Sequence, residues 1–167
     1  QLYFVSPSQI NGVLPAGLPT GRTSFAVISG QSAVGLGTAT VAATAPSLFQ
    51  ASTAGAAAGQ AVYVNGGAQS FASLADASGA PAPIDLSAGE AYLVLYGTGL
   101  RAGAGAVAAQ VASLSVPVYY AGPQNQYPGM DQVTLGPLPP TLAGNSAAPV
   151  VLTVAEGRAN TVTISFR

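Results

Sequence analysis

The sequence predicts an all-β protein of the β-sandwich class. Its 167 residues include 21 Gly and 13 Pro, which leave few windows able to hold a helix of ordinary length. Between these breakers lie short runs rich in Val, Thr, Tyr and Phe, a composition typical of strands. Many short strands joined by turns, with no helix between them, favour a sandwich.

Four strands are expected near the start of the chain, each ended by a Pro or Gly. They cover residues 2–5, 9–14, 23–29 and 38–44. The segment that follows differs, because residues 51–60 consist mainly of small side chains. Two glycines there each oppose a helix by about 1 kcal/mol, so a loop or one short turn is expected.

A β-hairpin is predicted for residues 61–64 and 68–74, because Asn65-Gly66 between them suits a tight turn with positive φ. Residues 76–83 are then expected to form a loop. Residues 92–96 are apolar on both faces and should form a central strand. Further strands are predicted at residues 107–111, 114–120, 131–135, 150–154 and 161–166. The last alternates between one buried and one wet face.

Charge is scarce, and this excludes several classes of partner. Charged residues make up 5% of the chain, against about 25% in a typical soluble domain. The net charge is −1, with no basic patch to bind nucleic acid or an anionic membrane. Residues 102–122 carry no charge, but polar residues and Pro117 interrupt them and part of the run alternates like a strand. No membrane span is therefore predicted.

The same composition favours an extracellular or cell-surface location. A nearly uncharged protein diffusing freely in the cytosol would tend to associate, whereas neutral surfaces rich in Thr, Ser and Ala are common among secreted structural proteins. The first residues lack the features of a signal peptide, so an exported form is expected to be a mature chain beginning at Gln1. Glycosylation of Ser and Thr would add solubility; there is no Asn-x-Ser/Thr sequon.

No catalytic, metal or cofactor site is predicted. The chain has no His, Lys or Cys, so a Ser or Thr nucleophile would have no such base. The spacing of the carboxylates, among them Asp76, Asp85, Glu90 and Asp131, does not support a glycosidase pair. Asp131 is expected to tether the loop that precedes it. Gly97-Thr98-Gly99 is interpreted as a turn, since it is too short for a phosphate-binding loop.

Tyrosines provide the only sequence hint of ligand binding. The side chains of Tyr119, Tyr120 and Tyr127 could stack against sugar rings, which makes glycans a candidate partner. Packing in the core and at the rim of a sandwich is the favoured interpretation of the same residues.

An approximate internal repeat links the start of the chain to its second half. The first copy contains Tyr3, Gln9-Ile10-Asn11, Leu14-Pro15 and Leu18; the second contains Tyr120, Gln132-Val133-Thr134, Leu138-Pro139 and Leu142. The spacing from Gln to Leu-Pro differs by one residue. Each copy is followed by a predicted strand, a glycine turn and a Thr-rich strand.

These blocks resemble an uncharacterised family of bacterial secreted proteins abundant in Acidobacteria such as Solibacter. The resemblance spans nearly the whole chain. The motifs that carry it are Tyr3-Phe4-Val5-Ser6-Pro7-Ser8-Gln9-Ile10-Asn11, Leu95-Tyr96-Gly97-Thr98-Gly99, Tyr120-Ala121-Gly122-Pro123, Gly129-Met130-Asp131-Gln132-Val133 and Asn160-Thr161-Val162. It implies export and paired immunoglobulin-like units of the transcription-factor-like (IPT/TIG) type. It implies no catalytic residues.

Set against that family, the first unit is expected to be incomplete. Residues 1–47 are predicted to form a partial immunoglobulin-like unit lacking its opening strands, residues 48–89 a connecting segment with a hairpin, and residues 90–167 a complete unit. An open apolar sheet edge is an association hazard. Either residues 48–89 fold back to cover it, or a neighbouring chain supplies strands.

The favoured hypothesis is an exported structural subunit that assembles head-to-tail into an extracellular fibre, a homopolymer held by β-strand complementation. The expected assembly interface is Leu2, Tyr3, Phe4, Val5, Ile10, Leu14, Val162, Ile164 and Phe166. The alternative is a glycan- or protein-binding immunoglobulin-like module of a larger bacterial cell-surface protein. No cofactor and no enzymatic activity are expected under either hypothesis.

Overall fold

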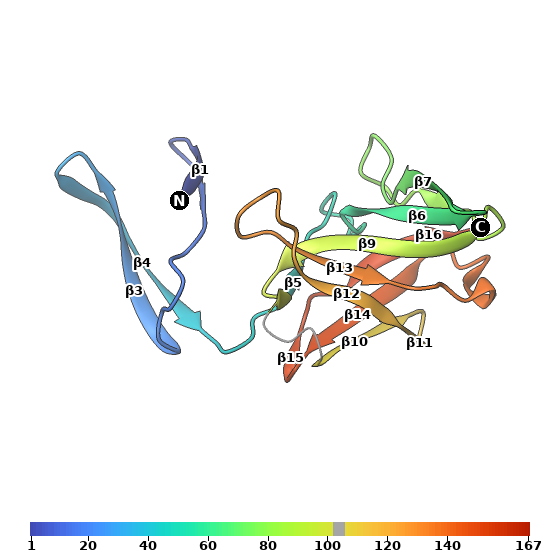
Figure 1. Ribbon diagram of the computed structural model, residues 1–167. Coiled ribbons are helices and arrows are strands. Elements are labelled where there is room, and N and C mark those ends of the chain that lie inside the picture. Colours follow the sequence, from blue (N-terminus) through green and yellow to red (C-terminus); the bar gives the residue numbers. More distant parts are fainter. Residues whose placement is uncertain (102–105) are drawn as a thin grey trace. The chain divides into compact units, whose positions relative to one another are not determined.

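The computed structural model describes residues 1–101 and 106–167, and the regular secondary structure of these residues is almost entirely β-strand. The chain divides into two compact units, Gln1–Ala43 and Thr44–Arg167, here called unit 1 and unit 2 (Figure 1). The predicted all-β class is confirmed. The domain organisation differs from the expected three parts, because residues 48–89 belong to unit 2.

Unit 1 consists of two antiparallel hairpins. Strand β1 (Leu2–Val5) pairs with β2 (Ile10–Gly12), and β3 (Gly21–Ser29) pairs with β4 (Ser32–Val41). All four predicted strands are present, and β4 begins six residues earlier than expected (32 against 38). Gly30 allows the tight turn before it, with φ of +62°. None of the residues of unit 1, all of which the structure describes, is buried.

Unit 2 is a sandwich of two sheets that enclose one hydrophobic core (Figure 1). The first sheet has the order β12-β13-β9-β6-β7, with β5 also paired to β9. Its strands are β5 (Ser47–Leu48), β6 (Gly59–Asn65), β7 (Ala68–Ser73), β9 (Glu90–Thr98), β12 (Val118–Pro123) and β13 (Asp131–Leu135).

The second sheet has the order β11-β10-β14-β16-β8, with β15 also paired to β14. Its strands are β8 (Pro83–Ile84), β10 (Val107–Val111), β11 (Leu114–Val116), β14 (Ala148–Val154), β15 (Gly157–Arg158) and β16 (Val162–Phe166). A short 3-10 helix (Pro140–Leu142) lies between β13 and β14.

Strand β9 lies in the middle of the first sheet, as its apolar sequence predicts. It pairs antiparallel with both β6 and β13. Leu93 and Leu95 point into the core with at most 1% of their surface exposed, and Val94 on the other face is buried as well. The outer face is only partly covered, since Tyr92 and Tyr96 are partly exposed, so the apolar run correctly indicates a central strand but not complete burial on both faces.

The segment expected to connect two units is part of the unit 2 sandwich. The predicted hairpin is present as β6 and β7, with positive φ at Gly66 and Gly67. Leu48, Leu74 and Ile84 from this segment are all buried in the core. The segment therefore completes unit 2, which needs more strands than residues 90–167 supply.

The predicted strand at residues 114–120 is wrong as a single element. It consists of β11 and β12, which lie in different sheets, with Pro117 between them. Proline has no N–H to continue a ladder, so the chain leaves one sheet there and enters the other. The first four residues of the uncharged stretch 102–122 lie outside the described residues. No helix in the part of the chain that is described is long and apolar enough to cross a membrane.

The wet face predicted for the last strand is also only partly correct. Ser165 of β16 is buried, although the alternation places it on the wet face. In the sheet, β8 pairs with this strand in parallel, and Ser165 lies opposite Pro83. Thr163 on the same face is partly exposed. The alternation in the sequence thus identifies the core-facing residues but does not predict the burial of Ser165.

The glycines of Gly97-Thr98-Gly99 allow a close backbone approach. Gly97 lies within β9, and a Cβ there would be 2.1 Å from the carbonyl oxygen of Ser47. Gly99 has φ of +68°, and a Cβ there would be 2.4 Å from the carbonyl oxygen of Ala45. The turn interpretation holds for Gly99, and both glycines make room for the chain that leads into β5.

Candidate functional site

The hairpins of unit 1 correspond to hairpins of unit 2 through the internal repeat. By the Gln9 and Gln132 blocks, β1–β2 matches β12–β13, and the following β3–β4 matches β14–β16; all four pairs are antiparallel. In unit 2, β13 pairs with β9 on its second side and β14 pairs with β10. Within the described residues, β2 and β3 have no second partner strand. Among the described residues β4 pairs with β3 alone, whereas its counterpart β16 pairs with β14 and also with β8. Unit 1 therefore presents three open strand edges at positions that are paired in unit 2.

Equivalent side chains are buried in unit 2 and exposed in unit 1. Ile10 is 42% exposed, whereas its counterpart Val133 is 0% exposed. Leu14 is 59% exposed, whereas its counterpart Leu138 is 6% exposed. If the strands that start at Thr23 and Val150 are aligned, Phe25 (46%) matches Leu152 (0%). The surface of unit 1 is thus a core face without its cover.

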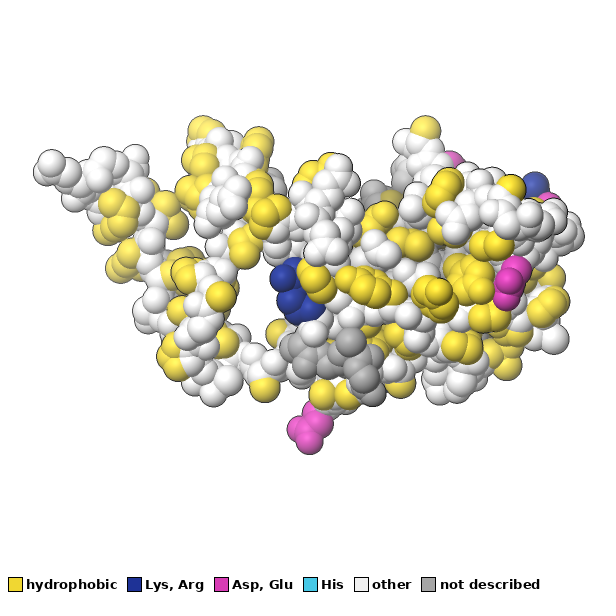
Figure 2. Space-filling model, viewed as in Figure 1, with side chains coloured by type: hydrophobic (Ala, Val, Ile, Leu, Met, Phe, Trp, Pro, Cys, Tyr) yellow, Lys and Arg dark blue, Asp and Glu magenta, His cyan; other side chains and the backbone are white. Residues whose placement is uncertain are grey.

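The exposed side chains of unit 1 line two adjoining hollows, of about 390 and about 630 Å³. Figure 2 shows hydrophobic side chains at the surface over the hairpins of this unit. We call six of the apolar residues that line the first hollow the open face: Leu2, Ile10, Leu14, Phe25, Val27 and Ile28. The Phe25 ring lies over Gly37 of β4, where a Cβ would be 2.3 Å from the ring.

The predicted interface residues fall into two groups. Those at the N-terminus are all exposed on β1, β2 and the segment after β2: Leu2, Tyr3, Phe4, Val5, Ile10 and Leu14. Those at the C-terminus, Val162, Ile164 and Phe166, are at most 3% exposed and belong to the core of unit 2. Their strand, β16, pairs with β14 on one side and β8 on the other. An interface through the C-terminal group would require β16 to leave its sandwich, so only the N-terminal group is available in this fold.

The sequence prediction omitted several exposed residues of the second hairpin. Phe25, Ile28, Val34 and Leu36 are between 46% and 83% exposed. The internal repeat could have identified Phe25 as an interface residue. It aligns β3 with β14, in which every second residue is buried, and Phe25 falls at one of these buried positions.

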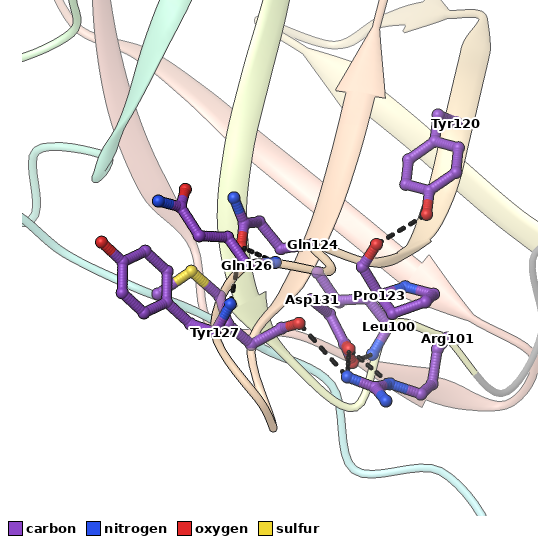
Figure 3. Close-up of polar contacts among 9 residues, drawn as sticks. Leu100, Arg101, Tyr120, Pro123, Gln124, Gln126, Tyr127 and Asp131 are labelled. Atoms are coloured by element: carbon purple, nitrogen blue, oxygen red, sulfur yellow. Dashed lines mark hydrogen bonds and ion pairs between the residues drawn. The ribbon is translucent and has the colours of Figure 1, made fainter. Parts of the chain in front are cut away.

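Asp131 has a structural role, although it holds a different loop from the one predicted. Its carboxylate is buried and accepts hydrogen bonds from the backbone N–H of Leu100, at 2.8 Å, and from Nε of Arg101 (Figure 3). The Arg101 guanidinium also donates to the carbonyl of Met130. Asp131 therefore fixes the residues that follow β9, while Gln124 binds the backbone N–H groups of its own loop (Figure 3).

Asn160 holds the strand through which the chain enters unit 2. Its Oδ1 accepts from the backbone N–H of Leu48 at 2.8 Å, and its Nδ2 donates to the carbonyl of Leu48 at 3.0 Å. Ser47 Oγ donates to the same Oδ1. The Asn160 side chain thus pairs with the backbone of β5 as a neighbouring strand would. The contact joins residues 112 positions apart in the sequence.

Of the remaining carboxylates considered as catalytic candidates, Glu90 is the first residue of β9, and Asp76 and Asp85 act within turns. Asp76 accepts hydrogen bonds from Ser78 and from the backbone N–H of Ala80, which lower the pKa of its carboxyl group. Hydrogen bonds from Ser87 lower the pKa of Asp85, and Arg167 contributes from 3.4 Å away. Among the described residues no group of three or more acidic side chains is arranged to hold a metal ion.

Unit 2 is expected to lose stability in acid through these two turns. A carboxyl group whose pKa is lower when folded stabilises the fold above its ordinary pKa, and that contribution disappears as the pH falls through the folded value. The thermal midpoint should therefore fall as the pH drops below about 4, the ordinary pKa of an Asp side chain. It should fall less in the double variant Asp76→Asn/Asp85→Asn, as followed by circular dichroism. An identical acid dependence in both proteins would contradict this role.

The three tyrosines singled out in the sequence lie near the rim of unit 2. Tyr120 donates from its hydroxyl to the carbonyl of Pro123, and Tyr127 extends from the loop before Asp131 (Figure 3). Tyr119 is 77% exposed, so packing in the core does not account for it. No family model, curated protein or solved structure matches this chain. A functional proposal therefore has to rest on the geometry described above.

Proposed function

We propose that the chain is an exported structural subunit that assembles into an extracellular fibre, with unit 1 of each subunit completed by β-strands of a neighbouring subunit. The observation that supports this most directly is the exposure of unit 1 side chains whose repeat counterparts are buried. Ile10, Leu14 and Phe25 are 42–59% exposed, and their counterparts in unit 2 are at most 6% exposed.

The open face offers enough apolar surface to drive association. Complete burial of one Leu, Ile or Phe side chain stabilises by about 1.5–3 kcal/mol, so a half-exposed side chain can still gain about 1 kcal/mol. The open face has five such residues in each subunit, Leu2, Ile10, Leu14, Phe25 and Ile28. Together with those contributed by the partner, their gain is comparable to the association cost of about 4–15 kcal/mol. The large side chains exposed around the open face, such as Val34 and Leu36, add to that total.

The open strand edges supply direction and register. Strand addition uses main-chain hydrogen bonds for affinity and side-chain pockets for specificity, and β2 and β3 each have one unpaired side within the described residues. When such contacts repeat from subunit to subunit without closing, the product is a filament. The nearly neutral composition favours association and suits a secreted structural protein.

Sedimentation velocity at increasing protein concentration, together with electron microscopy, tests this proposal. The unmodified chain is expected to form large assemblies. The variant Leu2→Ser/Ile10→Ser/Phe25→Ser should remain monomeric, since it removes apolar contact without touching a buried residue.

The matched control is Phe71→Ser/Leu114→Ser, which changes exposed hydrophobic residues of unit 2 and should assemble as the unmodified chain does. Monodisperse monomers of the unmodified chain at high concentration would overturn the proposal. Equal loss of assembly in the control and the unit 1 variant would also overturn it, because the effect would then be general surface hydrophobicity.

A further inference from the structure

A small pocket lies on the outer face of the first sheet of unit 2, away from the core. Its volume is about 200 Å³, and its lining comes from all five main strands of that sheet: Val62, Val64, Gln69, Tyr92, Tyr119 and Thr134. Figure 2 shows hydrophobic side chains gathered on this face. Pockets for drug-sized ligands usually measure about 300–1,000 Å³, so this one suits a single ring.

A β-bulge places the most exposed aromatic residue at the pocket. The pairing of β12 with β13 shifts between Val118 and Tyr120, so Tyr119 is the extra residue. Its ring centroid lies 6.0 Å from that of Tyr92, with an angle of 68° between the ring planes. Bulges are known to redirect side chains beside functional sites. Because the Tyr119 side chain is 77% exposed, packing against the core contributes little to holding its ring beside that of Tyr92.

The Tyr92 ring is held in place by the neighbouring strand. It lies over Gly136, where a Cβ would come within 2.6 Å of the ring. Partial burial, followed by the adjacent Glu90 carboxylate, raises the pKa of the Tyr92 hydroxyl. The hydroxyl hydrogen is directed to the Glu90 carboxylate, which leaves the hydroxyl oxygen able to accept a hydrogen bond from a ligand. The pocket thus contains one fixed ring and one exposed ring that meet edge to face.

Polar groups border the two rings. The Thr134 hydroxyl oxygen accepts a hydrogen bond from Nε2 of Gln132 at 3.2 Å, which leaves its own hydrogen free to donate. The side-chain amide of Gln69 has no hydrogen-bond partner among the residues that the structure describes, and amides both donate and accept. No Arg is among the residues that line the pocket, so an anionic ligand would find no counter-charge there.

We propose that this pocket binds one neutral pyranose ring, such as a terminal hexose of a glycan. The apolar C–H face of a hexose can stack on the Tyr119 ring, and its hydroxyl groups can reach Gln69, Thr134 and Tyr92. The lack of a cation disfavours a sugar acid. This site is independent of the assembly proposed for unit 1, because every residue that lines it belongs to unit 2.

Titration of the full chain with methyl hexopyranosides of the gluco, galacto and manno series tests the site by NMR. Binding should shift the aromatic signals of Tyr92 and Tyr119. Tyr119→Ala should weaken the affinity at least about tenfold, in line with the loss of one stacking contact of about 1.4 kcal/mol. Tyr119→Phe should retain the affinity, because it keeps the ring.

The matched control is Tyr127→Ala, which removes another exposed tyrosine outside the pocket and should leave binding unchanged. The proposal is overturned if no hexoside shifts the Tyr92 and Tyr119 signals, if Tyr119→Ala binds as well as the unmodified chain, or if Tyr127→Ala weakens binding equally. Sedimentation of Tyr119→Ala should be unaltered, so failure of this site and failure of the assembly proposal are separate results.

Discussion

The substitution Leu152→Ala is expected to destabilise unit 2 by about 3 kcal/mol, whereas Phe25→Ala should cost the monomer no more than about 1 kcal/mol. Leu152 is 0% exposed in the core, so its truncation removes apolar contacts and leaves a cavity. Phe25 occupies the equivalent repeat position but is 46% exposed. The two residues would be expected to behave alike if both units had complete cores.

Both costs can be measured by guanidinium denaturation followed by circular dichroism, at a protein concentration low enough to keep the chain monomeric. Under assembling conditions, Phe25→Ala should also raise the concentration at which the chain associates, because a neighbouring subunit buries this ring in the proposed fibre. Equal costs for the two substitutions in the monomer would contradict the description of unit 1 as a core face without its cover.

The substitution Asp131→Ala is expected to cost unit 2 about 3 kcal/mol. It removes a buried carboxylate that accepts from the backbone of Leu100 and from Arg101, and it leaves the Leu100 N–H, 2.8 Å from the carboxylate in the native fold, without a partner. Arg101→Ala should cost less, since its side chain is 47% exposed and can be solvated when unpaired. Asp76→Ala, in an exposed turn, is the control for loss of a carboxylate and should have a much smaller effect.

Thermal unfolding of these three variants provides the measurement. If Asp131→Ala unfolded at the same temperature as Asp76→Ala, the buried carboxylate would not be holding the residues after β9. An Asp131→Asn variant that recovers part of the loss would indicate that the acceptor atom matters as well as the charge.

The strands that the sequence predicts best are those with a strong local signal. Tyr92 to Tyr96 is apolar on both faces, and Asn65-Gly66 specifies a tight hairpin turn. The short strands β5 and β8 have two residues each and therefore no periodicity to detect. The change of sheet at Pro117 was missed because the residues on either side of it both read as strand. A contact such as that of Asn160 with Leu48 depends on residues far apart in the chain.

The candidate sites, too, depend on contacts between residues that are far apart in the sequence. The sequence alternation of β16 identifies its apolar face, but only the fold shows that β14 and β8 pair with both of its edges. The exposed run at Leu2–Val5 looks equally apolar and lies at the surface. The pocket on unit 2 combines Gln69, Tyr92 and Thr134 from separate strands, so no local motif could have identified it. The bulge that exposes Tyr119 depends on the register between β12 and β13.

The way in which the chain enters unit 2 has a mechanical consequence. Any tension transmitted along the chain from unit 1 reaches unit 2 through β5, which is held by two paired residues of β9 and by the side-chain amide of Asn160. The central ladder between β9 and β13 has five paired residues and lies further from the point of loading. Under load, β5 would detach first and lengthen the tether, while the rest of the sandwich stayed folded. In the proposed fibre under shear, this strand would serve as an extensible link that yields with the exposure of Leu48 alone, before the rest of the core is uncovered.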